Sequence, residues 1–162
     1  PENYLQYEDY IGTYTATVDD YDEGPTSQSV TITPKVRGES YTLKSIGGFN
    51  FTLLYDKASG KLILDSQSIS PVSSSSYYFA CAAGVEGYAH TELSLPSRLR
   101  SGLVNVTVKI NPFTFYFADK ASQENTSLII WAYSSDEYST SGLMGYWSWY
   151  NSILMEKENE GN

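Results

Sequence analysis

Flat aromatic side chains gather near the end of the sequence at spacings that suit ligand binding. Trp147 and Trp149 are two residues apart in the stretch YWSWY, so on a β-strand both would project from one face and the flanking tyrosines from the other. Trp131 and Tyr133 form a second pair of this kind. Rings that alternate with hydroxyl groups suit stacking on sugars or enclosing an apolar ligand.

The alternative is that these four rings fill a barrel core or pack between two sheets. Trp131 fits this alternative better, because its stretch LIIWAY is apolar on both faces. Trp147 and Trp149 follow the polar segment 134–145 and are predicted to form a binding rim. The candidate ligand-binding residues are therefore Trp147 and Trp149, followed by Tyr133 and Trp131.

An acidic segment at residues 19–24 is the best candidate for a metal site. Asp20, Asp22 and Gly24 have the spacing that begins an oxygen-ligand calcium loop. The glutamate expected at the twelfth position of such a loop is absent, because Thr31 stands there. The segment therefore has two interpretations, a solvated hairpin turn and, as the minor hypothesis, a calcium site at Asp20 and Asp22.

Nucleophilic catalysis and zinc chemistry lack the residues they need. The chain has one histidine, His90, one cysteine, Cys81, and no G-x-S-x-G motif. A single imidazole leaves one base for any nucleophile and cannot build a histidine zinc site. Cys81 lies in the apolar run YYFACAAGV and is predicted to be a small buried hydrophobe. We therefore expect no enzymatic activity and no cofactor, with His90 on a surface or loop.

The composition restricts the partners. The formal net charge is −9 and the ten Lys and Arg residues are scattered, whereas binding of nucleic acid requires clustered basic side chains. No apolar run is long enough to span a membrane. No leader-like segment precedes Tyr4, so we expect a secreted or cell-envelope domain from which a signal peptide has been removed.

Antiparallel strands are the elements that would hold these residues. The clearest is a hairpin at 51–67, FTLLYDKASGKLILDSQ, whose two arms alternate apolar and polar residues. Asp56 can accept bonds from the turn amides, and Gly60 can take the positive φ that ends such a turn. Similar patterns predict strands at 10–18, 29–36, 41–44, 77–85, 104–110, 113–117, 128–133 and 146–155. Residues 69–76 are predicted to be a low-complexity loop, and 86–103 fit either a short helix or an irregular segment.

This pattern predicts a single β domain over residues 1–162, with a lead-in at 1–9 and a frayed tail at 156–162. The short links between the early strands favour an antiparallel meander. Closing the meander into a barrel would pair its edges. The expected fold is therefore all-β, a barrel of about 8–10 strands, with a two-sheet β-sandwich as the alternative.

Two features resemble known families. Gly12-Thr13-Tyr14 resembles the G-x-W start of lipocalins, with Tyr14 in place of the tryptophan. More broadly, YIGTYTATV, SYTLKSI and FTLLYDKASGKLILDSQ resemble small β domains of envelope lipoproteins from gut Bacteroidetes. This resemblance covers the first 70 residues or so. It implies a lipocalin-like barrel, a lipid anchor upstream of Pro1 and a part in glycan capture, and it carries over no catalytic residue.

The leading functional hypothesis is a non-enzymatic envelope module that binds carbohydrate or a small apolar ligand. The alternative is a structural or protein-interaction domain of a larger surface lipoprotein, with no small-molecule site. A pocket lined by aromatic and polar groups would favour the first hypothesis, and a filled interior with a flat surface would favour the second.

Overall fold

The computed structural model describes residues 4–84 and 102–158, and in these residues eleven antiparallel strands form one sheet. In the same described residues, two 3₁₀ helices, η1 (Tyr7–Tyr10) and η3 (Thr140–Gly142), accompany the sheet. The strands are β1 (Gly12–Asp20), β2 (Gly24–Val36), β3 (Ser40–Ile46), β4 (Phe49–Asp56), β5 (Lys61–Leu64), β6 (Gln67–Pro71), β7 (Tyr78–Ala83), β8 (Leu103–Ile110), β9 (Phe113–Asp119), β10 (Leu128–Tyr133) and β11 (Leu143–Lys157).

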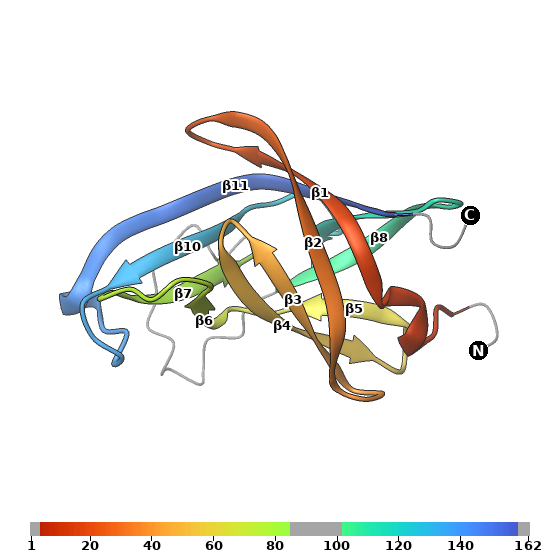
Figure 1. Ribbon diagram of the computed structural model, residues 1–162, viewed down its shortest axis with the longest axis horizontal. Helices are drawn as coiled ribbons and strands as arrows, with labels where there is room; N and C mark the ends of the chain where they lie inside the picture. The colour runs from red at the N-terminus through yellow and green to blue at the C-terminus, as the bar shows by residue number, and fades with distance from the viewer. Residues whose placement is uncertain (1–3, 85–101, 159–162) are drawn as a thin grey trace.

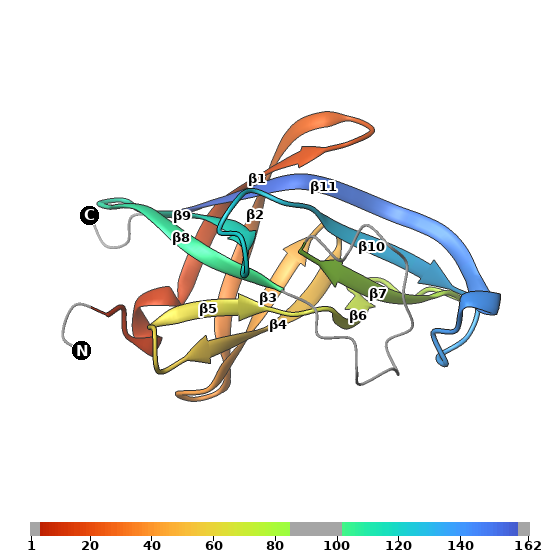
Figure 2. The ribbon, with the colours of Figure 1, turned by 180° about the vertical axis from the view of Figure 1, so that it is seen from behind.

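Two sets of paired strands, which we call walls, connect β4 to β11 and close the sheet on itself. Strands β1 to β5 form a meander, and β8 and β9 continue it to the C-terminal end of β11, which pairs back to β1. This ring has eight strands: β1, β2, β3, β4, β5, β8, β9 and β11. Strands β10, β7 and β6 form a second wall from the N-terminal part of β11 to β4. Figures 1 and 2 place the β5–β8–β9 wall toward the end that holds both termini and the other wall toward the opposite end. The predicted all-β, barrel-like antiparallel fold is confirmed.

The Gln67 side chain joins the two walls where β5 leaves β4. Its Oε1 accepts the Thr52 N–H at 2.8 Å, and its Nε2 donates to the Thr52 carbonyl at 3.0 Å. A side-chain amide carries the same donor and acceptor as a peptide group. Gln67 therefore takes the place of a strand residue opposite Thr52, and the backbone of β4 remains paired across the gap.

Tyrosines close the end of the barrel that η1 covers. Tyr10, Tyr14 and Tyr41 are fully buried, and each hydroxyl donates to a main-chain carbonyl at 2.6–2.9 Å. The acceptors are the carbonyls of Gly60, Tyr10 and Tyr7. Phenylalanine rings of β9 pack against Tyr10 and Tyr14 with centroid separations of 5.6–6.1 Å. Because these buried hydroxyls have acceptors, this end of the barrel is a filled floor.

The hairpin predicted at 51–67 is confirmed by β4 and β5. Gly60 has φ 72°, and its N–H donates to the Asp56 carbonyl at 2.7 Å. The Asp56 carboxylate accepts the Ala58 N–H at 3.2 Å. The alternation predicted for the first strand is also confirmed, since Tyr14, Ala16 and Val18 are fully buried in β1.

Two predicted loops are shorter than expected. The loop predicted at 69–76 begins later, because β6 extends to Pro71 and buries Ile69. The strand predicted from residue 29 begins at Gly24, and Pro25 pairs with Asp19. Proline is tolerated there because β3 pairs with β2 only from Thr31 onward, which leaves this part of β2 at an edge.

The two ends of the domain are more ordered than predicted. The lead-in predicted at 1–9 contains the start of η1, whose Tyr7 is buried. The prediction that the tail frays from Glu156 is wrong for its first two residues. Glu156 pairs with Thr15, and Lys157 pairs with Tyr14. Of the region predicted as ambiguous, residues 86–101 lie outside the described residues. In the described part of the chain, no helix has the length and apolar character needed to span a membrane.

Candidate ligand-binding site

A β-bulge at Trp147 decides where the aromatic rings of β11 point. Ile130 pairs with Ser148 and Trp131 pairs with Tyr146, so Trp147 is an extra residue between two paired positions. A bulge interrupts the alternation of faces along a strand. The prediction that Trp147 and Trp149 share one face is therefore wrong, because a spacing of two gives one face only in an unbroken ladder.

The ring of Trp147 lies against two rings at the start of β7. Its centroid is 5.3 Å from that of Phe79 and 6.3 Å from that of Tyr77. Phe79 is buried and packs in turn on Phe49 at 4.8 Å. Trp147 is 54% exposed, so one part of the indole rests on the core and the rest faces solvent. We call Trp147, Tyr77 and Phe79 the mouth cluster.

The other predicted ligand-binding residues lie elsewhere. Trp149 contacts Tyr146 with a centroid separation of 5.6 Å, and Trp131 contacts Tyr146 at 6.5 Å. Tyr133 is buried, and its ring packs edge-on against Tyr138 at 5.3 Å. The structure therefore does not unite the four predicted residues in one site. Tyr133 supports Tyr138 rather than presenting its own ring.

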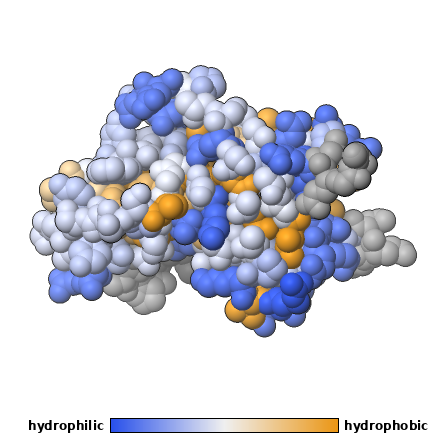
Figure 3. All heavy atoms as spheres, viewed as in Figure 1, coloured by the Kyte–Doolittle hydropathy of each residue, from blue (hydrophilic) through white to orange (hydrophobic). Residues whose placement is uncertain are grey.

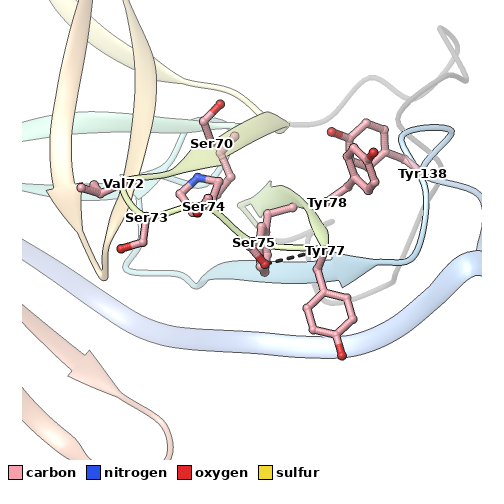
Figure 4. A pocket seen from close by; sticks show the side chains of 11 residues that line it. Ser70, Val72, Ser73, Ser74, Ser75, Tyr77, Tyr78 and Tyr138 are labelled. Carbon is pink, nitrogen blue, oxygen red and sulfur yellow. Dashed lines mark hydrogen bonds between the residues drawn. The ribbon is translucent and has the colours of Figure 1, made fainter.

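A pocket of about 380 Å³ adjoins the mouth cluster, with which it shares Tyr77 and Phe79 (Figure 4). Its walls are the end of β6, the serine segment at residues 72–75, the start of β7 and the segment before η3. Figure 4 shows Tyr78 and Tyr138 on one side of the serine segment, with Tyr77 directed toward β11. The lining residues are Ile69, Ser70, Pro71, Val72, Ser73, Ser74, Ser75, Tyr77, Tyr78, Phe79 and Tyr138.

Two main-chain N–H groups donate the hydrogen bonds that hold the serine segment in place. The Val72 N–H donates to the Gly48 carbonyl at 2.7 Å, which ties the segment to the β3–β4 turn. The Tyr77 N–H donates to Ser75 Oγ at 3.1 Å. Burial raises the pKa of Tyr138. Its hydroxyl, like that of any tyrosine, is protonated at neutral pH and can donate a hydrogen bond. The pocket thus presents several hydroxyl groups and aromatic rings on a defined backbone.

Sequence reasoning missed most of this pocket. The serine segment was expected to be a poorly organised loop, and Tyr77 and Tyr78 were expected only to start a strand. The available signal was the sequence SSSSYY itself, which sets aromatic rings directly after hydroxyl groups. Aromatic rings beside hydroxyl groups are also the pattern that predicted a binding site at Trp147 and Trp149.

The acidic segment forms a hydrogen-bonded hairpin turn. Asp20 Oδ1 accepts the N–H groups of Asp22 and Glu23 at 2.8 and 3.1 Å. The Asp22 carboxylate accepts the Tyr146 hydroxyl at 3.1 and 3.2 Å. Within residues 4–84 and 102–158, no three His, Cys, Asp or Glu side chains lie close enough together to hold a metal.

The two residues considered for nucleophilic chemistry have different outcomes. Cys81 is buried and belongs to the hydrophobic core, as the sequence predicted. His90 lies outside the described residues.

The comparisons with known proteins give a family without an assigned activity. A model of a protein family described as a domain of unknown function matches residues 1–131. No curated protein and no solved structure matches the chain. The matched residues include the serine segment and Tyr78 and end before Tyr138 and Trp147, so the pocket is built from both sides of that boundary.

Proposed function

The chain belongs to the DUF4987 family, a domain of unknown function, and we propose that it is a non-enzymatic module that binds neutral carbohydrate beneath its serine segment. The proposal includes the cell-envelope location, the upstream lipid anchor and the kinship with lipocalin-like Bacteroidetes lipoprotein domains that the sequence resemblance implies. The observation that carries it is the chemistry of the pocket lining.

Hydroxyl groups and aromatic rings are the groups that recognise sugars without charge. Each serine can donate and accept a hydrogen bond, as sugar hydroxyls require. The rings of Tyr78 and Tyr138 offer apolar faces for the C–H surface of a pyranose. Among the described residues that line the pocket, none is charged. The pocket volume of about 380 Å³ lies within the usual range for small-ligand sites.

These features favour a neutral sugar over the small apolar ligand that was the other expectation. An apolar ligand would need an enclosed hydrophobic chamber, and at the η1 end tyrosine and phenylalanine rings fill the interior. The same filled floor favours the second candidate, a structural or protein-interaction domain. The carbohydrate-binding module and the structural domain differ in whether the serine pocket binds a ligand.

Replacing Tyr78 with alanine is expected to weaken binding to neutral glycans about tenfold, because a stacking ring is lost from the pocket wall. The measurement is a titration of the protein with a panel of neutral oligosaccharides, in which binding is monitored by intrinsic fluorescence and by calorimetry. Tyr138→Ala is expected to have a similar effect. Tyr78 is 44% exposed, so its removal should leave the fold intact.

The matched control is Tyr4→Ala, since Tyr4 is 38% exposed and lies beside η1, away from the pocket. The control should bind as the parent protein does. Failure of the parent to bind any neutral glycan at millimolar concentration would contradict the proposal. Equal losses in Tyr4→Ala and Tyr78→Ala would contradict it as well.

A further inference from the structure

A second group of aromatic rings lies on the outer surface, away from the serine pocket. Trp149 packs on Tyr21 with a centroid separation of 5.7 Å and on Tyr146 at 5.6 Å. Tyr21 is 64% exposed and Tyr146 is 40% exposed. We call Tyr21, Tyr146 and Trp149 the outer cluster.

The β1–β2 hairpin and β11 hold the outer cluster together. The Tyr21 N–H donates to the Trp149 carbonyl at 2.8 Å, which fixes the hairpin tip to β11. The Tyr146 hydroxyl donates to the Asp22 carboxylate from the same tip. This bond to Asp22 raises the pKa of Tyr146, as a neighbouring negative charge does. The rings of the outer cluster and the carboxylate of Asp22 are therefore held together by hydrogen bonds on one surface.

The segments that build this surface are acidic and contain no basic residue. Residues 12–34 and 121–156 have no Lys or Arg. In Figure 3 the tip of the β1–β2 hairpin, at the top of the view, is strongly hydrophilic. The acids that hydrogen bonds place at the hairpin tip beside the outer cluster are Asp20, Asp22 and Glu23. Such a surface attracts cations and repels anions.

We propose that the outer cluster binds an organic cation of the quaternary ammonium class. Aromatic faces carry negative electrostatic potential, and an ammonium group within about 6 Å of a ring centroid is attracted to it. The planes of Trp149 and Tyr146 meet at 85° in an edge-to-face contact, so a compact, roughly spherical cation beside this contact would lie near both rings. A flat sugar ring would stack on only one of them.

The carboxylate of Asp22 completes this surface by supplying charge. It already accepts the Tyr146 hydroxyl, and a quaternary ammonium group has no N–H that would compete for the same oxygen atoms. The bulge at Trp147 separates this surface from the mouth cluster. The inference is therefore independent of the function proposed for the serine pocket.

The test compares choline with its uncharged isostere 3,3-dimethylbutan-1-ol. Both are titrated into ¹⁵N-labelled protein while the indole N–H resonances are followed, assigned by Trp131→Phe, Trp147→Phe and Trp149→Phe. Choline is expected to shift the Trp149 resonance saturably and to bind about threefold to fivefold more tightly than the isostere. Added salt should weaken choline binding and leave the isostere unchanged.

Two variants locate the contacts. Tyr21→Ala and Asp22→Asn should each weaken choline binding about threefold, and Trp147→Phe should leave it unchanged. Thermal unfolding of each variant establishes that the fold is retained. Equal binding of choline and the isostere, a shift at Trp147 in place of Trp149, or no saturable shift would each overturn the proposal.

Discussion

Raising the pH above about 10 is expected to destabilise the protein by about 4 kcal/mol for each further pH unit. Burial raises the pKa of Tyr10, Tyr14 and Tyr41 well above the ordinary tyrosine value. In the unfolded chain these phenols lose their protons near pH 10, while in the folded protein they stay neutral. The stabilisation is therefore fully present below pH 10 and is lost as the pH rises. Each group contributes about 1.4 kcal/mol per unit.

The measurement is the free energy of unfolding from urea titrations at half-unit steps between pH 8 and pH 11. Tyr14→Phe provides the internal test, because it removes one titrating group and one hydrogen bond. At pH 8 this variant should be about 1 kcal/mol less stable than the parent, and its slope above pH 10 should be shallower by about 1.4 kcal/mol per unit. Equal slopes in the parent and Tyr14→Phe would contradict this account of the floor.

Replacing Asn105 with leucine is expected to cost about 3 kcal/mol of unfolding free energy. Asn105 is 1% exposed. Its Oδ1 accepts the Leu62 N–H at 2.7 Å, and its Nδ2 donates to the Tyr10 hydroxyl at 3.1 Å. The isosteric apolar side chain would leave the Leu62 N–H buried without its acceptor and remove a partner from Tyr10. Each such loss costs about 1–3 kcal/mol.

Chemical denaturation at pH 7 measures this effect. The matched control is Asn125→Leu, because Asn125 is exposed in the β9–β10 connection. Its change should stay within about 0.5 kcal/mol. A loss below about 1 kcal/mol in Asn105→Leu would mean that the β5–β8 pairing does not depend on the side-chain amide.

The strands could be predicted because local pattern and tertiary role coincide in them. In β1, alternate residues Tyr14, Ala16 and Val18 are buried, and the turn of the β4–β5 hairpin follows from Asp56 and Gly60. The division of the barrel into two walls could not be predicted. At this division the Gln67 side-chain amide replaces a backbone pair at Thr52, and a polar residue in a strand gives no such signal.

The candidate site was only partly predictable for a related reason. Trp147 was identified by its residue type, but its direction depends on a bulge that arises from pairing with β10. The serine segment carries no periodicity, and its shape comes from contacts with the distant Gly48. Tyr138 joins the pocket from a segment about 60 residues further along the chain. The meeting of these distant segments at one pocket is set by the tertiary fold and not by the local sequence.

The most direct test of the proposed function is chemical-shift mapping of the backbone amides during titration with the tightest neutral oligosaccharide from the panel. Binding in the serine pocket predicts saturable shifts confined to residues 69–79 and to Tyr138, with an additional shift of the Trp147 indole. Shifts confined to the η1 end of the barrel or to Tyr21 and Trp149, or no saturable shift at all, would contradict the proposal.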